Sequence, residues 1–445
     1  LQMIPKTQMS DEERVRDLQR KLYLKAKREK EFRFYVLYDK IRLGHFLREA
    51  YRRCSANKGA PGVDGVRFED IEREGEVKLL EEIRQELESR TYKPSAVLRK
   101  YIPKGNGKMR PLGIPTIKDR VIQMAVKMVI EPIFEADFEE CSYGFRPKRS
   151  TRGAVKEIKQ KLQEGNTAVY DADLRACFDT IPHRELLRLI GRRISDKNII
   201  HVIKMWLKAP IMEDERPKGG KKNKVGTPQG GVISPLLANI YLNVIDKAVN
   251  RQDGIFKKGG IKIVRYADDF VLMGRQLQSQ SIEYFKSLLE RMKLTLNKEK
   301  SRVLNAREKP FDFLGFTFRN DKDIYGRKMK YWNIIPSEKS MKKVRTKIKE
   351  YLCENGHKSP ENISRGLNMI TRGWLNYFTI GNVSYPQKAK RKLRYYLMEK
   401  LQRYYRRKSQ RKSKLYNRGA FQVLVDSYGL IDPYKSLSMM AAVNV

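Results

Sequence analysis

The stretch RYADDFVLM, residues 265–273, decides the class of fold that this chain can adopt. It joins two runs of high β propensity, residues 261–266 and 270–273, which are separated only by the tripeptide Ala267-Asp268-Asp269. Two such runs with a short polar connection predict a β-hairpin. The predicted hairpin therefore carries two adjacent carboxylates at its tip.

A second predicted strand also ends in a carboxylate. Residues 167–174 (TAVYDADL) alternate along the chain, so Val169, Asp171 and Asp173 lie on one side of the strand. The helix predicted before this strand, residues 153–163, has its apolar residues on one face. Because helices and strands interleave in this part of the chain, we expect a mixed α+β fold.

The composition indicates a polyanionic partner. The 445 residues include 94 Lys and Arg against 52 Asp and Glu, so the formal net charge is 94 − 52 = +42. A charge of this size repels itself, and binding to a polyanion relieves the repulsion and releases counterions. Nucleic acid is the favoured partner. An anionic membrane surface is the alternative, but it usually requires an amphipathic anchor or a lipidation signal, and the sequence contains neither.

Length and cysteine usage narrow the class of protein further. With 40% hydrophobic residues and about 150 residues per domain, the chain has room for two to four domains with real cores. No stretch has the pattern of a signal peptide or the length of a bilayer span. Cys54, Cys141, Cys177 and Cys353 lie far apart, which predicts neither a disulfide framework nor a zinc finger. We expect a soluble intracellular protein with reduced thiols.

The carboxylates of Asp173, Asp268 and Asp269 suggest metal-dependent chemistry. Carboxylates within apolar strands need a counterion, and adjacent carboxylates repel each other unless a divalent metal relieves the repulsion. Two Mg²⁺ ions about 4 Å apart would activate an attacking hydroxyl and stabilise a leaving pyrophosphate, which is the chemistry of nucleotidyl transfer. Taken alone, the residues leave another interpretation open, because Asp268-Asp269 suits a solvated turn and Asp173 suits a cap or an ion pair.

Turn formers and apolar patterns predict the elements around the two strands. Residues 103–108 are expected to form a hairpin tip. Residues 119–130 are apolar nearly all round, which predicts a buried helix that ends at Pro132. Residues 213–224 are polar and rich in Gly and Lys, which predicts a mobile loop. Another helix is expected to open at Ser234-Pro235.

From about residue 336 the pattern is helical throughout. Apolar residues repeat at helical spacing in two successive segments, as Met341, Val344, Ile348 and Leu352 and then as Ile363, Leu367, Ile370, Trp374 and Tyr377. A third helix is expected from residue 387 to about 407. Residues 388–414 hold 13 Lys or Arg and one acid, with four tyrosines between them, which favours a nucleic-acid surface.

Taken together, these segments resemble the motifs of reverse transcriptases. RYADDFVLM resembles their catalytic hairpin, and DLRACFD (173–179) resembles their first catalytic motif. Further segments match in the expected order, namely KGNGKMRPLGIPT (104–116), SYGFRPKRS (142–150), GTPQGGVISPLLANIYLN (226–243), LTLNKEKS (294–301), FLGFTF (313–318) and RGWLNYF (372–378). The second and third of these are similar to group II intron enzymes in particular, and the last resembles their maturase-specific thumb. Over roughly residues 40–405 the chain is identified as a member of the group II intron-encoded reverse transcriptase/maturase family.

The resemblance assigns roles to the residues that match its motifs. Asp173, Asp268 and Asp269, with the carbonyl of Leu174, are the implied ligands of two Mg²⁺ ions. The implied nucleotide-binding residues are Lys104, Arg110, Phe178, Gln229, Gly230 and Lys300. The residues implied to contact primer or template are Tyr266, Ala267, Leu314 and Gly315.

Each nucleotide-binding residue has an expected task. Lys104 and Arg110 would clamp the triphosphate, since their charges suit phosphate. Phe178 would exclude a ribose 2′-hydroxyl, Gln229-Gly230 would lie against base and ribose, and Lys300 would protonate pyrophosphate. Plainer interpretations remain open, because Phe178 also suits an ordinary core and the two lysines also suit a solvated surface.

The resemblance implies a right-hand polymerase, with fingers and an antiparallel palm sheet followed by an α-helical thumb. The expected parts are an N-terminal extension (1–38), fingers with the start of the palm (39–166), the palm with an inserted region at 183–224 (167–335), the thumb or maturase domain (336–405) and a short basic segment for DNA or RNA (406–445). The expected RNA-binding residues are Arg372, Trp374, Lys390, Arg391, Lys392, Arg394, Arg403, Arg406 and Arg407. A solvated basic face with core tyrosines is the alternative.

The expected function is that of an RNA-directed DNA polymerase with maturase activity. It would bind its group II intron RNA to promote splicing, and it would copy an RNA template with dNTPs from a DNA primer or target DNA during intron mobility. We expect no second-strand cleavage, because no paired cysteines occur and only about forty residues follow the thumb. A splicing-only maturase and a domesticated reverse transcriptase in repair or defence are the alternatives. The expected location is the prokaryotic cytoplasm or nucleoid, without a membrane partner.

Overall fold

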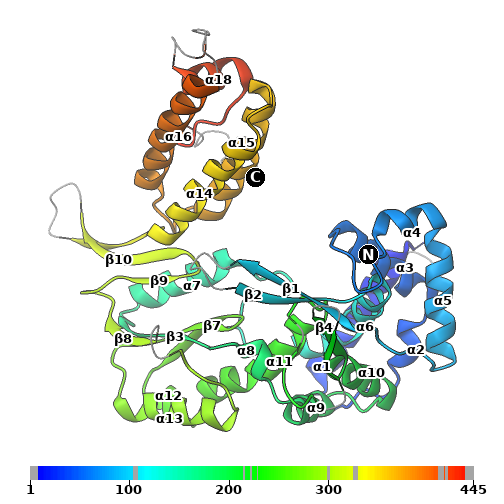
Figure 1. Ribbon diagram of the computed structural model, residues 1–445. Coiled ribbons are helices and arrows are strands. Elements are labelled where there is room, and N and C mark those ends of the chain that lie inside the picture. The colour runs from blue at the N-terminus through cyan, green and yellow to red at the C-terminus, as the bar shows by residue number, and fades with distance from the viewer. Residues whose placement is uncertain are drawn as a thin grey trace. The chain divides into compact units, whose positions relative to one another are not determined.

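Helices form most of the N-terminal and C-terminal parts of the chain, and strands concentrate between them (Figure 1). The computed structural model describes residues 9–103, 109–213, 216–220, 223–227, 229–297, 301–323, 329–408, 415 and 419–435. The chain divides into a first unit of residues 1–150, 172–272 and 277–302 and a second unit of residues 151–171, 273–276 and 303–445. The mixed α+β class predicted from the sequence is confirmed.

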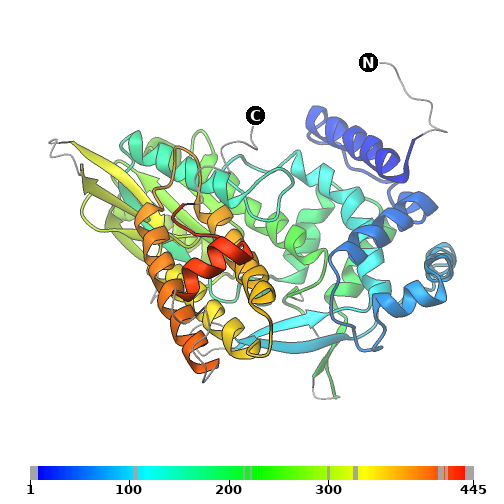
Figure 2. The ribbon, with the colours of Figure 1, turned by 90° about the horizontal axis from the view of Figure 1, so that it is seen from above.

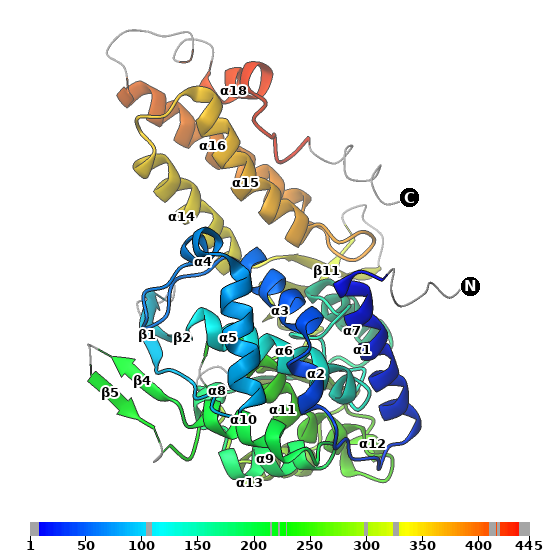
Figure 3. The ribbon, with the colours of Figure 1, turned by 90° about the vertical axis from the view of Figure 1, so that its right-hand side faces the viewer.

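The first unit begins with helices that pack around one buried helix. These helices are α1 (Asp11–Arg28), α2 (Tyr38–Ile41), α3 (Gly44–Ala56), α4 (Phe68–Glu74), α5 (Glu76–Glu88) and α6 (Ile117–Glu135). Helix α6 is buried on nearly every side, as its apolar residues predict, and α1, α3 and α5 contact it (Figure 3). Helix α1 opens with a capping box between Ser10 and Glu13, which satisfies backbone N–H groups at its start.

The predicted end of α6 at Pro132 was wrong, since the helix continues to Glu135. A proline has no N–H group, so it leaves the carbonyl of the residue four positions earlier, here Met128, without its helical partner. The side-chain amide of Gln19, on α1, donates to that carbonyl at 2.9 Å. A side chain from a neighbouring helix therefore satisfies the acceptor, and the interior proline is tolerated.

One four-stranded sheet of the first unit has the strand order β2-β1-β4-β5. Its strands are β1 (Val97–Pro103), β2 (Met109–Ile114), β4 (Pro210–Glu213) and β5 (Arg216–Gly219). β1 and β2 pair antiparallel, which confirms the strands on both sides of the predicted hairpin tip. The mobile loop predicted over 213–224 was wrong for residues 216–219, which form β5 and pair with β4. Their polar composition suits an edge strand, which is paired on one side only.

The predicted carboxylate strands belong to a sheet with the order β6-β7-β3-β8. Its strands are β3 (Ala168–Asp173), β6 (Lys262–Tyr266), β7 (Asp269–Gly274) and β8 (Arg302–Asn305). The predicted hairpin is confirmed as β6 and β7, with Ala267 and Asp268 in the turn. The helices in this region are α7 (Thr151–Gln163), α8 (Cys177–Thr180), α9 (His183–Gly191), α10 (Lys197–Leu207), α11 (Ser234–Asn250), α12 (Ile255–Lys258) and α13 (Ser279–Arg291). Of these, α7 and α11 confirm the helices predicted at 153–163 and at Ser234.

In the second unit a small sheet precedes a helical bundle. The sheet has the order β11-β10-β9, with β9 (Phe311–Phe313), β10 (Phe316–Lys322) and β11 (Lys330–Pro336). The helices are α14 (Glu338–Glu354), α15 (Pro360–Phe378), α16 (Gln387–Lys408) and α18 (Ala420–Tyr428). Helix α18 contacts both α15 and α16 (Figure 2). Helices therefore follow residue 336, as predicted.

The apolar stripe predicted on α14 is fully buried, and the one predicted on α15 is buried only in part. Ile363, Leu367 and Trp374 are buried on α15, whereas Tyr377 remains 40% exposed. Among the helices in the described parts of the chain, none combines the length and the apolar character needed to cross a bilayer.

Candidate active site

The three predicted carboxylates come from adjacent strands of one sheet. β3 ends at Asp173, β7 begins at Asp269, and the two strands are neighbours in the sheet order. Asp268 precedes β7 in the hairpin turn. Asp173 and Asp268 are half-buried and Asp269 is exposed, so solvent and a substrate have access to these groups.

The end of β3 is held by the segment that contains Asn297. The backbone N–H of Asn297 donates to the Asp173 carbonyl at 2.8 Å, and its side-chain amide donates to the Asp173 carboxylate at 3.2 Å. The backbone N–H of Asp173 donates in turn to the Ser301 hydroxyl at 3.4 Å. Sequence reasoning assigned no role to Asn297, although it lies within the LTLNKEKS motif. It orients the first carboxylate.

The donor atoms suit a divalent cation. They are carboxylate oxygens and the backbone carbonyl of Leu174, the ligand types that Mg²⁺ prefers. In the part of the chain that the structure describes, however, no three acidic, His or Cys side chains are gathered closely enough to hold an ion. The fit of Asp173, Asp268 and Asp269 to a divalent metal therefore rests on the chemistry of their oxygens and on their positions at the ends of neighbouring strands.

Tight packing shapes the turn between β6 and β7. Ala267 is buried and has a backbone φ of +57°, a conformation that is uncommon outside glycine. A Cβ atom placed on Gly144 would lie 2.3 Å from the Ala267 nitrogen, so only glycine fits there. The backbone of Gly144, within the SYGFRPKRS motif, therefore packs directly on the turn that carries Asp268. Tyr266, predicted to contact the primer, is half-buried beside the turn.

The structure brings five predicted residues together around one cavity of about 730 Å³ in the first unit. These residues are Arg110, Phe178, Gln229, Gly230 and Asp268. Lys58, Arg120 and Lys127, to which sequence reasoning gave no role, also line it. Cationic side chains, an aromatic side chain and a carboxylate thus share the cavity, a combination that suits a nucleoside triphosphate. Lys104 and Lys300 lie outside the described residues.

Gln229 connects a cation to an anion. Arg110 Nε donates to Gln229 Oε1 at 3.2 Å, and Gln229 Nε2 donates to Asp179 Oδ2 at 3.1 Å. The two partners define which end of the amide faces Arg110, because a guanidinium only donates and a carboxylate only accepts. Asp179, the last residue of the DLRACFD motif, was given no role from the sequence, although it bonds to the side chain of Gln229.

Glycine is required at position 230 by the neighbouring strand. Gly230 has a φ of +113°, and a Cβ there would lie 2.4 Å from the carbonyl oxygen of Gly113 on β2. The N–H of Gly113 donates to the carbonyl of Gln229 at 2.5 Å. This segment and β2 therefore meet backbone to backbone, which holds Gln229 against the strand that carries Arg110.

Phe178 is 8% exposed and lines the cavity, so its ring is packed on one side and borders the cavity on the other. Its carbonyl accepts a hydrogen bond from the N–H of Thr227 at 2.7 Å. That contact ties the short helix α8 to the segment before Gln229. The position of Phe178 suits its predicted role as a gate.

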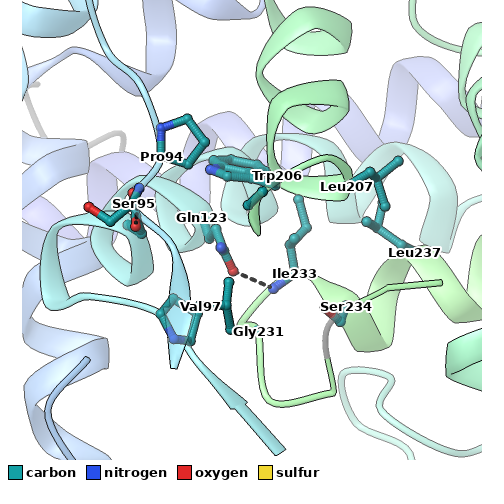
Figure 4. Close-up of a pocket in the computed structure, with 13 residues that line it drawn as sticks. Pro94, Ser95, Val97, Gln123, Trp206, Leu207, Gly231, Ile233, Ser234 and Leu237 are labelled. Atoms are coloured by element: carbon teal, nitrogen blue, oxygen red, sulfur yellow. Dashed lines mark hydrogen bonds between the residues drawn. The ribbon is translucent and has the colours of Figure 1, made fainter. Parts of the chain in front are cut away.

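A second cavity lies against the residues that follow Gly230 (Figure 4). It has a volume of about 20 Å³, enough for about one water molecule, and its lining is mostly apolar. At its edge the side-chain oxygen of Gln123, on α6, accepts from the N–H of Ile233 at 3.5 Å. Helix α6 therefore supports the loop and also contributes Arg120 and Lys127 to the larger cavity.

In the second unit the turn between β9 and β10 consists of Leu314 and Gly315, both with positive φ, +50° and +79°. The hydroxyl of Tyr377, on α15, donates to the Leu314 carbonyl at 2.9 Å. The hydroxyl of Ser340, on α14, donates to the Gly315 carbonyl at 2.9 Å. Leu314 and Gly315, two of the four residues predicted to contact primer or template, are thus attached to the helical bundle.

The predicted RNA-binding residues comprise six exposed side chains, two buried ones and the half-buried Arg394. Exposed side chains are those of Arg372, Arg391, Lys392, Arg403, Arg406 and Arg407. Lys390 is only 2% exposed and Trp374 only 7%, so both belong to the interior of the unit. Burial lowers the pKa of the Lys390 ammonium group. A signal for this was present, because Lys390 lies at helical spacing from Leu393 and Leu397, which are fully buried. Arg394 forms an ion pair with Asp432 at 3.0 Å.

Two family models match the chain. Residues 102–318 match the model described as reverse transcriptase (RNA-dependent DNA polymerase), and residues 341–420 match the one described as group II intron, maturase-specific domain. The first range includes all five predicted residues around the large cavity.

Similar proteins are found among bacterial and intron-encoded proteins. Protein YkfC of Escherichia coli strain K12 is 36% identical over 362 residues, which are 73% of this chain and 93% of YkfC. The group II intron-encoded protein LtrA of Lactococcus lactis subsp. cremoris is 43% identical over 201 residues, 45% of this chain and 33% of LtrA. A solved structure, the partial Cas6-RT-Cas1–Cas2 complex, is 24% identical and covers 57% of this chain and 41% of that chain, with a TM-score of 0.35.

Proposed function

This chain belongs to the family of group II intron-encoded reverse transcriptases and maturases, and we propose that it copies its intron RNA into DNA at the site of Asp173, Asp268 and Asp269. Its reverse transcriptase domain requires a divalent metal, and its maturase domain binds intron RNA to promote splicing. The observation that carries the proposal is that Asp268 lines the same cavity as Arg110, Phe178 and Gln229.

We infer that the fold is a right hand. Residues 39–166, with β1, β2 and helices α3 to α6, would form the fingers and the start of the palm. Residues 167–335, with the β6-β7-β3-β8 sheet and the inserted region at 183–224, would form the palm. Residues 336–405 would form the thumb. Residues 1–38 would form an N-terminal extension, and residues 406–445 a basic C-terminal segment. Residues 303–335, which include the β9–β11 sheet, belong to the same compact unit as the helical bundle.

In the proposed reaction the protein binds and orients a dNTP. Arg110, oriented by Gln229, would hold the triphosphate, and Phe178 would lie where a 2′-hydroxyl would project. Two Mg²⁺ ions at the carboxylates and the Leu174 carbonyl would activate the primer 3′-hydroxyl and neutralise the leaving pyrophosphate. Tyr266 and Ala267 would contact the primer end. As the resemblance implies, Lys104 would bind the triphosphate and Lys300 would protonate the pyrophosphate.

The exposed cations of α15 and α16 would contact the phosphates of intron RNA and of the template–primer duplex without reading base sequence. Exposed tyrosines such as Tyr395, 59% exposed, would stack on unpaired bases. The net charge of +42 supports this partner class. A target DNA would supply the primer during intron mobility. We infer a prokaryotic cytoplasmic or nucleoid location.

Primer extension and splicing, measured on the same preparation, test the proposal. Wild-type protein should extend a DNA primer on an RNA template with Mg²⁺ and should also promote splicing of its intron. Asp268→Asn should abolish extension and leave splicing intact, since only extension needs the carboxylate. Asp253→Asn is the control, because Asp253 is an exposed partner of Arg251. Wild-type protein that splices but does not extend would identify a splicing-only maturase.

A further inference from the structure

A fully buried ion pair lies beside the catalytic turn. Arg265, on β6, and Asp246, on α11, both have side chains that are 0% exposed. Arg265 Nε donates to Asp246 Oδ1 at 2.8 Å, and Nη2 donates to Asp246 Oδ2 at 2.5 Å. Although burial opposes the charged form, Asp246 raises the pKa of Arg265, so the guanidinium keeps its charge. Burying two charges is costly, and hydrophobic residues of similar volume often replace such pairs without loss of stability.

The remaining arm of the guanidinium reaches the turn itself. Arg265 Nη1 donates to the carbonyl of Ala267 at 2.9 Å and to the side-chain oxygen of Asn239 at 2.9 Å. Ala267 is the turn residue with a positive φ, and Asp268 follows it directly. The guanidinium is planar and rigid, so anchoring two nitrogens on Asp246 determines where the third one points.

Asn239 extends the same network to the opposite side of the turn. Its side-chain nitrogen donates to the carbonyl of Gly144 at 2.8 Å, and Asn239 is 1% exposed. Gly144 is the residue whose backbone packs against Ala267. The network therefore holds both the turn and the segment that covers it. Backbone in a sparsely populated conformation persists where its surroundings over-determine it, and this occurs often at functional sites.

We propose that Arg265, Asp246 and Asn239 are positioning residues that hold the Ala267 carbonyl and thereby present the Asp268 carboxylate to the catalytic metal. The inference rests on the proposed function, because it takes Asp268 as a metal ligand. None of the three residues needs to touch substrate or metal. Their contribution is to keep the turn in the geometry that metal binding requires.

Two variants separate positioning from simple stabilisation. Arg265→Lys keeps a cation beside Asp246 but loses the guanidinium nitrogen that donates to the Ala267 carbonyl. The double variant Arg265→Met/Asp246→Leu removes both charges together, so no unpaired charge is left in the core. Arg193→Lys is the matched control, because Arg193 is 4% exposed, pairs with Asp137 at 3.0 Å and donates to the carbonyls of Ala26 and Glu29 instead of the catalytic turn.

The main readout is direct Mn²⁺ binding, measured by calorimetry on protein without substrate. We expect at least a tenfold weaker affinity for Arg265→Lys and for the double variant, with Arg193→Lys unchanged. The Mg²⁺ concentration for half-maximal primer extension should rise in parallel, while the affinity for the RNA–DNA duplex should stay within twofold. Thermal unfolding identifies which variants fold.

Wild-type affinity for Mn²⁺ in either folded variant would overturn the inference. So would failure of both variants to fold while Arg193→Lys folds, because the network would then be needed for the core as a whole. If wild-type protein does not extend a primer on RNA, the proposed function fails independently of these results. The two failures are therefore distinguishable.

Discussion

The contact between Gln19 and the Met128 carbonyl predicts a measurable coupling to Pro132. Met128 is 1% exposed. Its carbonyl has no hydrogen-bond donor within the helix, because Pro132, four residues later, has no N–H group. Gln19→Met keeps the length of the side chain but removes the donor, which leaves a buried acceptor unsatisfied. We expect this change to lower the free energy of unfolding of the first unit by about 1–3 kcal/mol.

A double-mutant cycle isolates this effect. Pro132→Ala restores the N–H that can bond to Met128, so in that background Gln19→Met should cost about 0.5 kcal/mol, close to an ordinary surface change. Urea unfolding of the four proteins gives the coupling energy, taken from the transition of the first unit where more than one occurs. The same loss in both backgrounds would refute the reasoning, because Gln19 would then act through packing alone.

Three further predictions concern the site and the RNA surface. Phe178→Ala should lower the discrimination of dNTPs over NTPs by roughly 10- to 200-fold, the range that shape selection supplies, and unchanged discrimination in single-nucleotide incorporation would reject the gate. Tyr377→Phe should shorten the products made per binding event, because it removes the hydrogen bond from the Tyr377 hydroxyl to the Leu314 carbonyl. Tyr396→Phe removes a similar hydroxyl–carbonyl bond, to Arg345, and costs about the same 1 kcal/mol of stability, so it should leave product length unchanged. Product lengths that do not differ between the two variants would contradict a role for the Leu314 carbonyl bond. Replacing Lys392 and Arg406 together by Ala should reduce the log–log salt slope of RNA binding by about 1.4–1.8, whereas an unchanged slope would place the RNA surface elsewhere.

Local pattern was sufficient to predict the β6–β7 hairpin and the helical C-terminal part. β6 and β7 are rich in β-branched and aromatic residues around a short turn, and these determinants lie within a dozen residues of each other. The end of α6 was predicted wrongly for the opposite reason. The rule for an interior proline is correct locally, but Gln19, 109 residues from Met128, supplies the missing donor. Such a partner cannot be read from the helix itself.

The candidate site also combines residues that local sequence indicates with residues that only distant contacts bring together. The carboxylates, Phe178 and Gln229 belong to contiguous motifs, so the sequence indicates them. Asn297 reaches Asp173 across 124 residues and Asp246 reaches Arg265 across 19, and neither pairing has a signal in the chain because tertiary packing alone creates it. Lys390 is different, since its helical spacing from Leu393 and Leu397 is a local signal for the buried face of α16.

The most direct test of the central claim, that this sheet carries the polymerase site, compares two carboxylates on the same strand. Asp173 and Asp171 both lie on β3 and are both half-buried. In single-nucleotide incorporation on an RNA template with Mg²⁺, Asp173→Asn should lower the rate by at least about a hundredfold, since losing a metal ligand removes several kcal/mol of transition-state stabilisation. Asp171→Asn should stay close to the wild-type rate. Equal rates for the two variants, or a wild-type rate for Asp173→Asn, would contradict the account.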